Sequence, residues 1–212
     1  MNIRTTLFAS SLIAASLVSG AAQATLIDRG GGLIYDDQLN VTWLQDANYA
    51  KTSGYDDDGR MTWNDAMTWA ANLSYFDSVR NVTYADWRLP FVVDTDGPDA
   101  DALGNDGCIF AFTGTDCGYN VQTKSGATVY SELAYMYYVN LGLKGRYDTS
   151  GVSQSNFGIF GDNTSFGQND VGLIDNLQAY VYWSGTEYAP RTDYAWLFYT
   201  NYGNQAAFYK SN

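Results

Sequence analysis

The chain has 212 residues with 23 acidic and 11 basic side chains, two cysteines and no histidine, so its formal net charge is −12. Without imidazole, Ser-His-Asp and Cys-His catalysis, histidine-ligated metals and histidine-based pH switching are all excluded. The acidic excess argues against nucleic acids and anionic membrane surfaces as partners, because proteins bind both through clustered lysine and arginine.

Residues 1–24 are predicted to be a cleaved signal peptide. Arg4 gives a positively charged start, an apolar stretch runs over 7–18, and Ala22-Gln23-Ala24 is the small-x-small pattern that precedes cleavage. The apolar stretch is shorter than the roughly 20 residues that a transmembrane helix needs. We therefore expect an exported protein, extracellular, at the cell surface or periplasmic, with residues 25–212 forming one domain that is not inserted in a membrane.

The next elements in chain order are a hairpin and two helices. Residues 33–36 and 41–44 predict a β-hairpin. Thr62 followed by Asp65 resembles a capping box, and the apolar spacing after it predicts an amphipathic helix over 63–73. Ser131 can cap a second helix, with Gly142 as the residue that follows its end.

The end of the chain predicts strands. Runs rich in aromatic and apolar residues at 181–184, 194–199 and 206–209 are separated by turn formers. The stretch 91–128 is too polar and too rich in Gly and Asp for regular structure. The sequence therefore predicts an α+β domain with two helices packed on small antiparallel sheets, long irregular loops, and the first and last strands joined in one sheet.

Cys108 and Cys117 enclose a short loop rich in turn formers. In an exported protein such a pair usually forms a disulfide. Two sulfurs without histidine cannot complete a zinc site, and a redox pair normally has the spacing Cys-x-x-Cys. We expect a Cys108–Cys117 disulfide.

Several sequence blocks carry a resemblance to a known family. They are Thr42-Trp43-Leu44-Gln45-Asp46, Met61-Thr62-Trp63, Asp86-Trp87-Arg88-Leu89-Pro90 and Tyr182-Trp183-Ser184-Gly185-Thr186. With them, nearly the whole exported part resembles the bacterial domain family named after the C-terminal domain of the Legionella collagen-like adhesin. The resemblance implies a C-type lectin-like fold, similar to that of sulfatase-modifying factors, and a role in adhesion through carbohydrate binding.

The chain departs from the family pattern in two ways. Family members continue beyond the position of Asn212 into a last strand, so either the chain is truncated or that strand is supplied differently. The sulfated ligand associated with the family's namesake requires a basic surface. A chain this acidic should repel sulfates unless a cation bridges them, so only the fold and the general binding role are carried over.

Calcium is the one cofactor that the sequence suggests. Asp94, Asp96, Asp99 and Asp101 surround Gly97 and can supply the oxygen ligands that Ca²⁺ requires. The stretch 55–59 is a second, shorter candidate. The alternative for both is an exposed acidic loop whose aspartates cap turns.

The last 29 residues are rich in Tyr, Asn, Thr, Ser, Asp and Gly, a composition typical of antibody paratopes. The alternative is that about half of these residues decorate the solvent face of an antiparallel sheet. The predicted ligand-binding residues are Tyr188, Arg191, Asp193, Tyr194, Tyr199, Asn201, Tyr202, Asn204 and Tyr209.

Three residues of the resembling blocks are predicted to be structural. Trp87 and Trp183 should pack, and Arg88 should pair with a buried carboxylate, for which Glu132 at the start of the second helix is the candidate.

We therefore expect a non-enzymatic binding module that recognises a glycan or protein ligand at the cell surface or in the matrix. The alternative is a structural protein that assembles with its own copies into a surface layer or filament through an open strand edge. An enzyme would have to use paired carboxylates, as glycosidases do. With 23 acidic residues some pair lies close by chance, so this pattern carries little weight.

Overall fold

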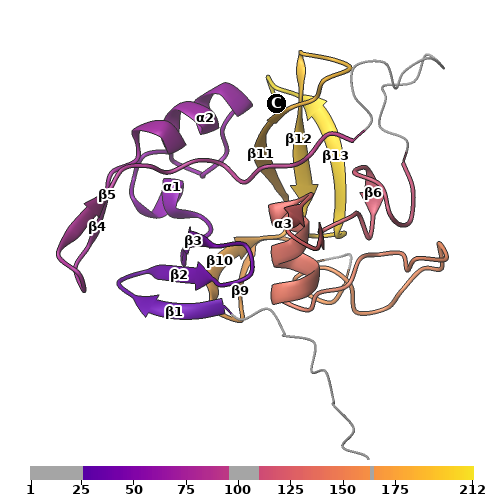
Figure 1. The fold of residues 1–212 in the computed structure, drawn as a ribbon, viewed down its shortest axis with the longest axis horizontal. Coiled ribbons are helices and arrows are strands. Elements are labelled where there is room, and N and C mark those ends of the chain that lie inside the picture. Colours follow the sequence, from indigo (N-terminus) through magenta and orange to yellow (C-terminus); the bar gives the residue numbers. More distant parts are fainter. Residues whose placement is uncertain (1–25, 96–109, 163–164) are drawn as a thin grey trace, which may run out of the picture.

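A computed structural model describes residues 26–95, 110–162 and 165–212 of the chain. These residues form an α+β fold of small antiparallel sheets with few helices (Figure 1). The predicted signal peptide lies outside the described residues. Within the described residues, no helix combines the length and the apolar character needed to cross a membrane.

The N-terminal part of the described chain builds a three-stranded sheet, two helices and a projecting hairpin. The sheet has the order β1-β2-β3, and the hairpin β4-β5 extends away from the rest of the molecule at the left of Figure 1. The elements are β1 (Leu26–Gly30), β2 (Leu33–Asp36), β3 (Val41–Leu44), α1 (Tyr49–Thr52), α2 (Trp63–Asn72), β4 (Tyr75–Asp77) and β5 (Val82–Tyr84).

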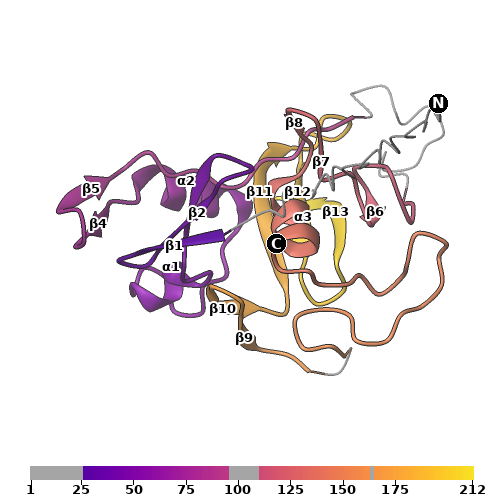
Figure 2. The same cartoon turned by 60° about the horizontal axis from the view of Figure 1, so that its bottom comes forward.

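The C-terminal part builds a four-stranded antiparallel sheet of order β11-β12-β13-β6 and two small strand pairs. Figure 2 shows the helical segment against one side of this sheet, and the long loop before β9 extending away from it. The elements are β6 (Gly118–Tyr119), β7 (Lys124–Ser125), β8 (Thr128–Val129), α3 (Glu132–Tyr135), the π-helix η1 (Met136–Asn140), β9 (Gln168–Val171), β10 (Ile174–Gln178), β11 (Val181–Glu187), β12 (Tyr194–Tyr199) and β13 (Asn204–Tyr209).

Both predicted helices are confirmed, and their caps explain where they start. The Thr62 side chain accepts a hydrogen bond from the Asp65 backbone N–H at 3.3 Å, which satisfies a free donor in the first turn of α2. Ser131 does the same for the Ala134 N–H at 3.1 Å. The second helix widens into η1 after one α-helical turn, and Gly142 follows its end with a φ of +61°.

The prediction that the first and last strands share one sheet is wrong. The β1-β2-β3 sheet is separate, and the fourth strand beside β13 is β6. The N-terminal part meets β10 instead, where the Ala47 N–H donates to the Asp175 carbonyl at 2.9 Å and the Asp175 N–H donates to the Gln45 carbonyl at 2.8 Å. The hairpin β9-β10, rather than the final strands, therefore joins the N-terminal part to the rest of the fold.

The core contains two clusters of buried side chains on the sheet and α3-η1. In the first cluster Tyr137 of η1 packs on Phe198 of β12, with ring centroids 5.1 Å apart. In the second, Trp196 is fully buried and meets Tyr188 edge to face at 5.0 Å. Cys117 belongs to this second cluster and is fully buried. Cys108 lies outside the described residues, so the Cys108–Cys117 disulfide stays a prediction.

The predicted pair of Arg88 and Glu132 is confirmed. Both Arg88 Nη atoms donate to the two Glu132 carboxylate oxygens, each at 2.7 Å, and the Phe91 N–H donates to the same carboxylate at 2.9 Å. The Glu132 side chain is 4% exposed and that of Arg88 is 53% exposed. The hydrogen bonds to Glu132 raise the pKa of Arg88. This arrangement ties the segment after β5 to the start of α3.

Replacing Arg88 with Glu should lower the melting temperature, because it leaves the Glu132 carboxylate buried beside a second negative charge. Breaking a buried pair costs about 3–5 kcal/mol, and the exposure of Arg88 reduces this to about 2–3 kcal/mol. Thermal unfolding followed by circular dichroism measures the change. The control Lys144→Glu makes the same charge change on an exposed side chain that has no ion pair in the described ranges. Equal melting temperatures for both variants would contradict the structural role of Arg88.

Candidate ligand-binding groove

A cavity of about 860 Å³ lies between β3, α2, the segment 87–90 and the strands β11 and β12. Its volume falls in the range of about 300–1,000 Å³ that is usual for small-molecule sites. Four of the six tryptophans of the chain contribute to its walls, and all four are partly exposed. The aromatic lining residues are Trp43, Trp69, Trp87, Trp183, Tyr180, Tyr182, Tyr199, Tyr137, Phe198 and Phe208. We call this cavity the aromatic groove.

The pairing of β11 with β12 explains why several lining residues lie on one face. Val181 is opposite Tyr199 and Trp183 is opposite Leu197 in the antiparallel register. Because side chains alternate along a strand, these four residues point to the same side of the sheet. The opposite side carries Trp196, which is fully buried in the core.

Two indole hydrogen bonds fix α2 against β11 at one end of the groove. The Trp63 Nε1–H donates to the Ser184 carbonyl at 2.7 Å, and the Trp183 Nε1–H donates to the Met61 carbonyl at 3.0 Å. Trp183 therefore packs as predicted, and it also lines the aromatic groove. Trp87 likewise donates to the Tyr84 carbonyl at 3.1 Å and contributes to the wall.

The exposed rim of the groove holds a cation on an aromatic ring. The guanidinium carbon of Arg60 lies 4.6 Å from the ring centroid of Tyr180, a cation–π geometry. Tyr180 is 45% exposed. Arg60 forms no ion pair with any residue that the structure describes, so its N–H groups are free to donate to a ligand.

Three of the sequence-predicted binding residues are buried. Tyr188 is fully buried, and Tyr194 and Asn204 are each 8% exposed. Alternation along β12 places Tyr194 on the same side as Trp196, which faces the core. These three side chains have little surface to offer a ligand, and we leave them out of the site.

The other predicted residues lie at two opposite ends of β12. At one end Arg191 lies 3.9 Å from the ring centroid of Tyr194, and its Nη2 is 3.2 Å from Asp193 Oδ2 and 3.4 Å from the Tyr209 hydroxyl. Hydrogen bonds from Tyr194 and from Arg191 lower the pKa of Tyr209. Tyr199, Asn201 and Tyr202 are at the other end, about 20 Å away along a six-residue strand. The nine residues therefore do not form one surface.

Tyr199 is the single residue of the predicted set that lines the aromatic groove. Tyr202, near it in sequence, packs instead against Phe157 at 6.3 Å and beneath Arg146 at 5.8 Å. The other groove residues were not predicted as binding residues, and they come from segments far apart in the chain, chiefly 42–50, 59–73, 87–90, 133–141 and 174–183. The sequence signal for part of them is tryptophan content, since four of the six tryptophans of the chain line the groove.

The calcium prediction remains a prediction. Asp96, Asp99 and Asp101 lie outside the described residues, and Asp94 accepts a hydrogen bond from the Ala189 N–H at 3.0 Å. In the shorter candidate, Asp56 caps a turn by accepting from the Asp58 and Gly59 N–H groups. Across 26–95, 110–162 and 165–212, no three acidic or cysteine side chains are grouped so that they could hold a metal ion.

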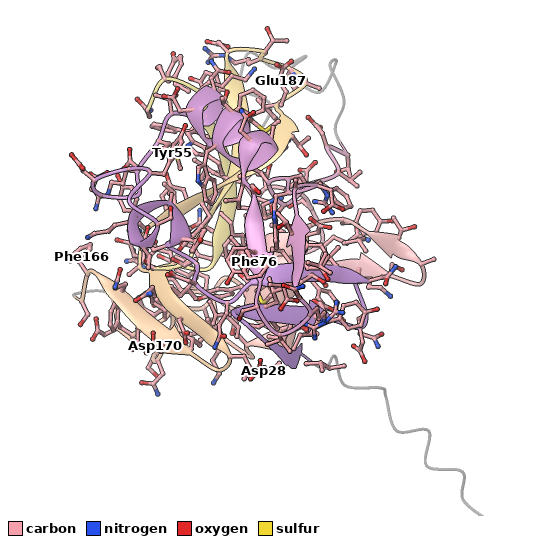
Figure 3. All side chains as sticks on the ribbon, turned by 90° about the vertical axis from the view of Figure 1, so that its left-hand side faces the viewer. Asp28, Tyr55, Phe76, Phe166, Asp170 and Glu187 are labelled. Carbon is pink, nitrogen blue, oxygen red and sulfur yellow. The ribbon has the colours of Figure 1, made fainter. Side chains whose placement is uncertain are left out.

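Acidic side chains gather beside the groove, where the residues that follow β3 meet β10. Asp46 lines the groove and pairs with Asp175 in a short parallel bridge. Asp28 and Asp170 lie at this end of the molecule, far from Glu187 at the opposite end (Figure 3). Partial burial, followed by the negative charges of Asp170, Asp46 and Asp28, raises the pKa of Asp175.

No family profile matches the chain, and neither a curated protein nor a solved structure matches it. The family resemblance of the sequence therefore depends on its motifs alone.

Replacing Asp175 with Asn should stabilise the protein at pH 7, because the ionised carboxylate is disfavoured in the folded state. A raised folded-state pKa means that this cost is present above that pKa and disappears below the unfolded-state value of about 3.9. The gain should be below about 1 kcal/mol, since Asp175 is partly exposed. Urea unfolding at pH 7 and at pH 3.5 measures it. A variant that is less stable than the wild type at pH 7, or equally improved at both pH values, would contradict the repulsion.

Proposed function

We propose that this protein is an exported, non-enzymatic binding module that holds a neutral glycan in the aromatic groove. The observation that carries the proposal is the groove itself, a site-sized cavity walled by four tryptophans and several tyrosines. The signal-like start of the sequence and its resemblance to an exported, lectin-like adhesin family support the same function. Both of these are sequence arguments and are independent of the cavity.

The chemistry of the groove suits a sugar chain. Aromatic side chains offer broad apolar faces for the C–H surfaces of pyranose rings, and partly exposed tryptophan and tyrosine rings are suited to such contacts. Arg60 at the rim can donate to ring hydroxyls, and Gln178 in the lining can both donate and accept. A neutral ligand also avoids the long-range repulsion of a chain with net charge −12.

The scarcity of acidic side chains in the groove favours binding over hydrolysis. Glycosidases of the common type place two carboxyl groups on either side of the bond that they cleave. Among the side chains that line the aromatic groove in the described structure, Asp46 is the only acidic one. Its carboxylate already accepts a hydrogen bond from the Asn48 N–H at 2.8 Å.

Assembly with further copies of the chain is the second candidate function. The observation that favours it is the outer side of β13, where, among the described residues, β6 pairs with Asn204 and Gln205 only and leaves the other four strand residues without a strand partner on that side. Size-exclusion chromatography with light scattering over a hundredfold range of concentration tests it. Mass that rises with concentration supports assembly, whereas a constant monomer mass contradicts it.

The groove can be tested with two tyrosines of nearly equal exposure. Tyr180 at the groove rim is 45% exposed and Tyr209, outside the groove, is 44% exposed. A panel of neutral cello-, xylo-, manno- and chito-oligosaccharides is titrated against the wild type, with tryptophan fluorescence as the readout. Loss of one aromatic platform costs about 1–2 kcal/mol, so Tyr180→Ala should weaken binding about tenfold and Tyr209→Ala less than about twofold.

If Tyr209→Ala weakens binding about tenfold and Tyr180→Ala does not, the site lies on the C-terminal surface predicted from the sequence. Equal binding by the wild type and both variants would contradict a groove site. Melting curves of both variants control for loss of folding.

A further inference from the structure

A second cavity of about 310 Å³ adjoins the aromatic groove. The two cavities share five lining residues, namely Thr42, Trp43, Trp87, Arg88 and Pro90. The second cavity continues from these residues toward β1, β2 and the segment that follows β5. Its volume lies at the lower end of the range for ligand sites.

Arg29 is held in this second cavity by an irregularity in β1. The pairing of β1 with β2 shifts by one residue between Asp28 and Gly30, so Arg29 is the extra residue of a β-bulge. Bulges redirect a side chain out of the regular alternation of the strand. The Arg80 Nη2 donates to the Arg29 carbonyl at 2.9 Å and fixes the backbone at this point.

The guanidinium of Arg29 makes few contacts with the described residues. Its Nη1 donates to Thr42 Oγ1 at 3.3 Å, and its carbon lies 5.7 Å from the Tyr35 ring centroid. It has no ion pair within the described part of the chain. Since a guanidinium carries five N–H donors, most of them remain available to oxygen atoms of a ligand.

The rest of the cavity supplies the complementary groups. Asp86 is exposed, lines the cavity and also lacks an ion pair in the described residues, so its carboxylate can accept hydrogen bonds. Arg88 and Glu132 line the cavity too, but they are bound to each other and add no net charge. Trp87 contributes an aromatic wall. Hydroxyl groups both donate and accept, so this combination fits a polyhydroxylated ring.

We propose that the second cavity is a subsite for a further sugar unit of the same glycan, and that Arg29 is its specificity-determining residue. This inference rests on the proposed glycan-binding function of the groove. The ligand is then an oligosaccharide long enough to extend past Trp43 and Trp87 and reach Arg29. The sugar unit that enters the second cavity must carry hydroxyl groups.

Chain length and Arg29 test the subsite together. The wild type, Arg29→Met and the control Arg146→Met are titrated with the two-unit and six-unit members of the cello-, xylo-, manno- and chito-oligosaccharide series. Arg146 is a matched control, because it lies 5.6 Å from the Tyr147 ring centroid and lines neither cavity. Melting temperatures show whether each variant is folded.

The wild type should bind the six-unit member of one series about tenfold more tightly than the two-unit member. Arg29→Met should remove most of this difference while leaving two-unit binding within about twofold, because charged hydrogen bonds contribute about 1.5–3 kcal/mol. Arg146→Met should behave as the wild type. The subsite is overturned if Arg29→Met keeps the length dependence, or if it weakens both lengths equally.

The failures of the two proposals are distinguishable. Binding that is lost in Tyr180→Ala but shows no dependence on length or on Arg29 contradicts the subsite and leaves the groove in place. Binding of no oligosaccharide by the folded wild type contradicts both.

Discussion

The bidentate pair between Arg88 and Glu132 is the interaction on which the arrangement of the molecule depends. Figure 1 shows the segment after β5 crossing from the N-terminal part to the C-terminal sheet. The pair anchors that segment to the start of α3, and the Gly185 N–H donates to the Pro90 carbonyl at 2.7 Å, which holds it to β11. A carboxylate buried to this extent is tolerated because both of its oxygens accept hydrogen bonds, from Arg88 and from the Phe91 N–H.

The groove is a consequence of this arrangement. The segment 87–90 forms one wall, and the crossed indole bonds of Trp63 and Trp183 hold α2 against the sheet without closing the space between them. Partly exposed tryptophan is costly to leave in water unless a ligand covers it, so a cavity with four such side chains is the part of the surface best suited to recognition. The net charge of −12 disfavours polyanions at long range, whereas Arg60 and Arg29 offer donors locally within the two cavities.

Local sequence signals predicted the local structure well. Residue types at short spacing predicted the caps at Thr62 and Ser131 and the hairpin of residues 33–44. The Arg88–Glu132 pair was predicted because a charged side chain in a packed turn needs a partner of opposite charge. The hairpin β9-β10 was missed because its Asn, Asp and Gln residues are poor strand formers, and its stability comes from pairing with residues 45–47. The groove was missed because its walls come from segments that only the tertiary fold brings together. Composition marked the last 29 residues as a surface, but β12 is an inner strand of its sheet and its residues 194–198 are all buried.

The measurement closest to the central claim is the nuclear magnetic resonance of the tryptophan indole N–H groups during titration with a neutral oligosaccharide. If the glycan occupies the aromatic groove, the signals of Trp43, Trp69, Trp87 and Trp183 should shift on binding, while that of the fully buried Trp196 should stay in place. Shifts confined to residues near Arg191 and Tyr209, with the four groove indoles unchanged, would contradict the account.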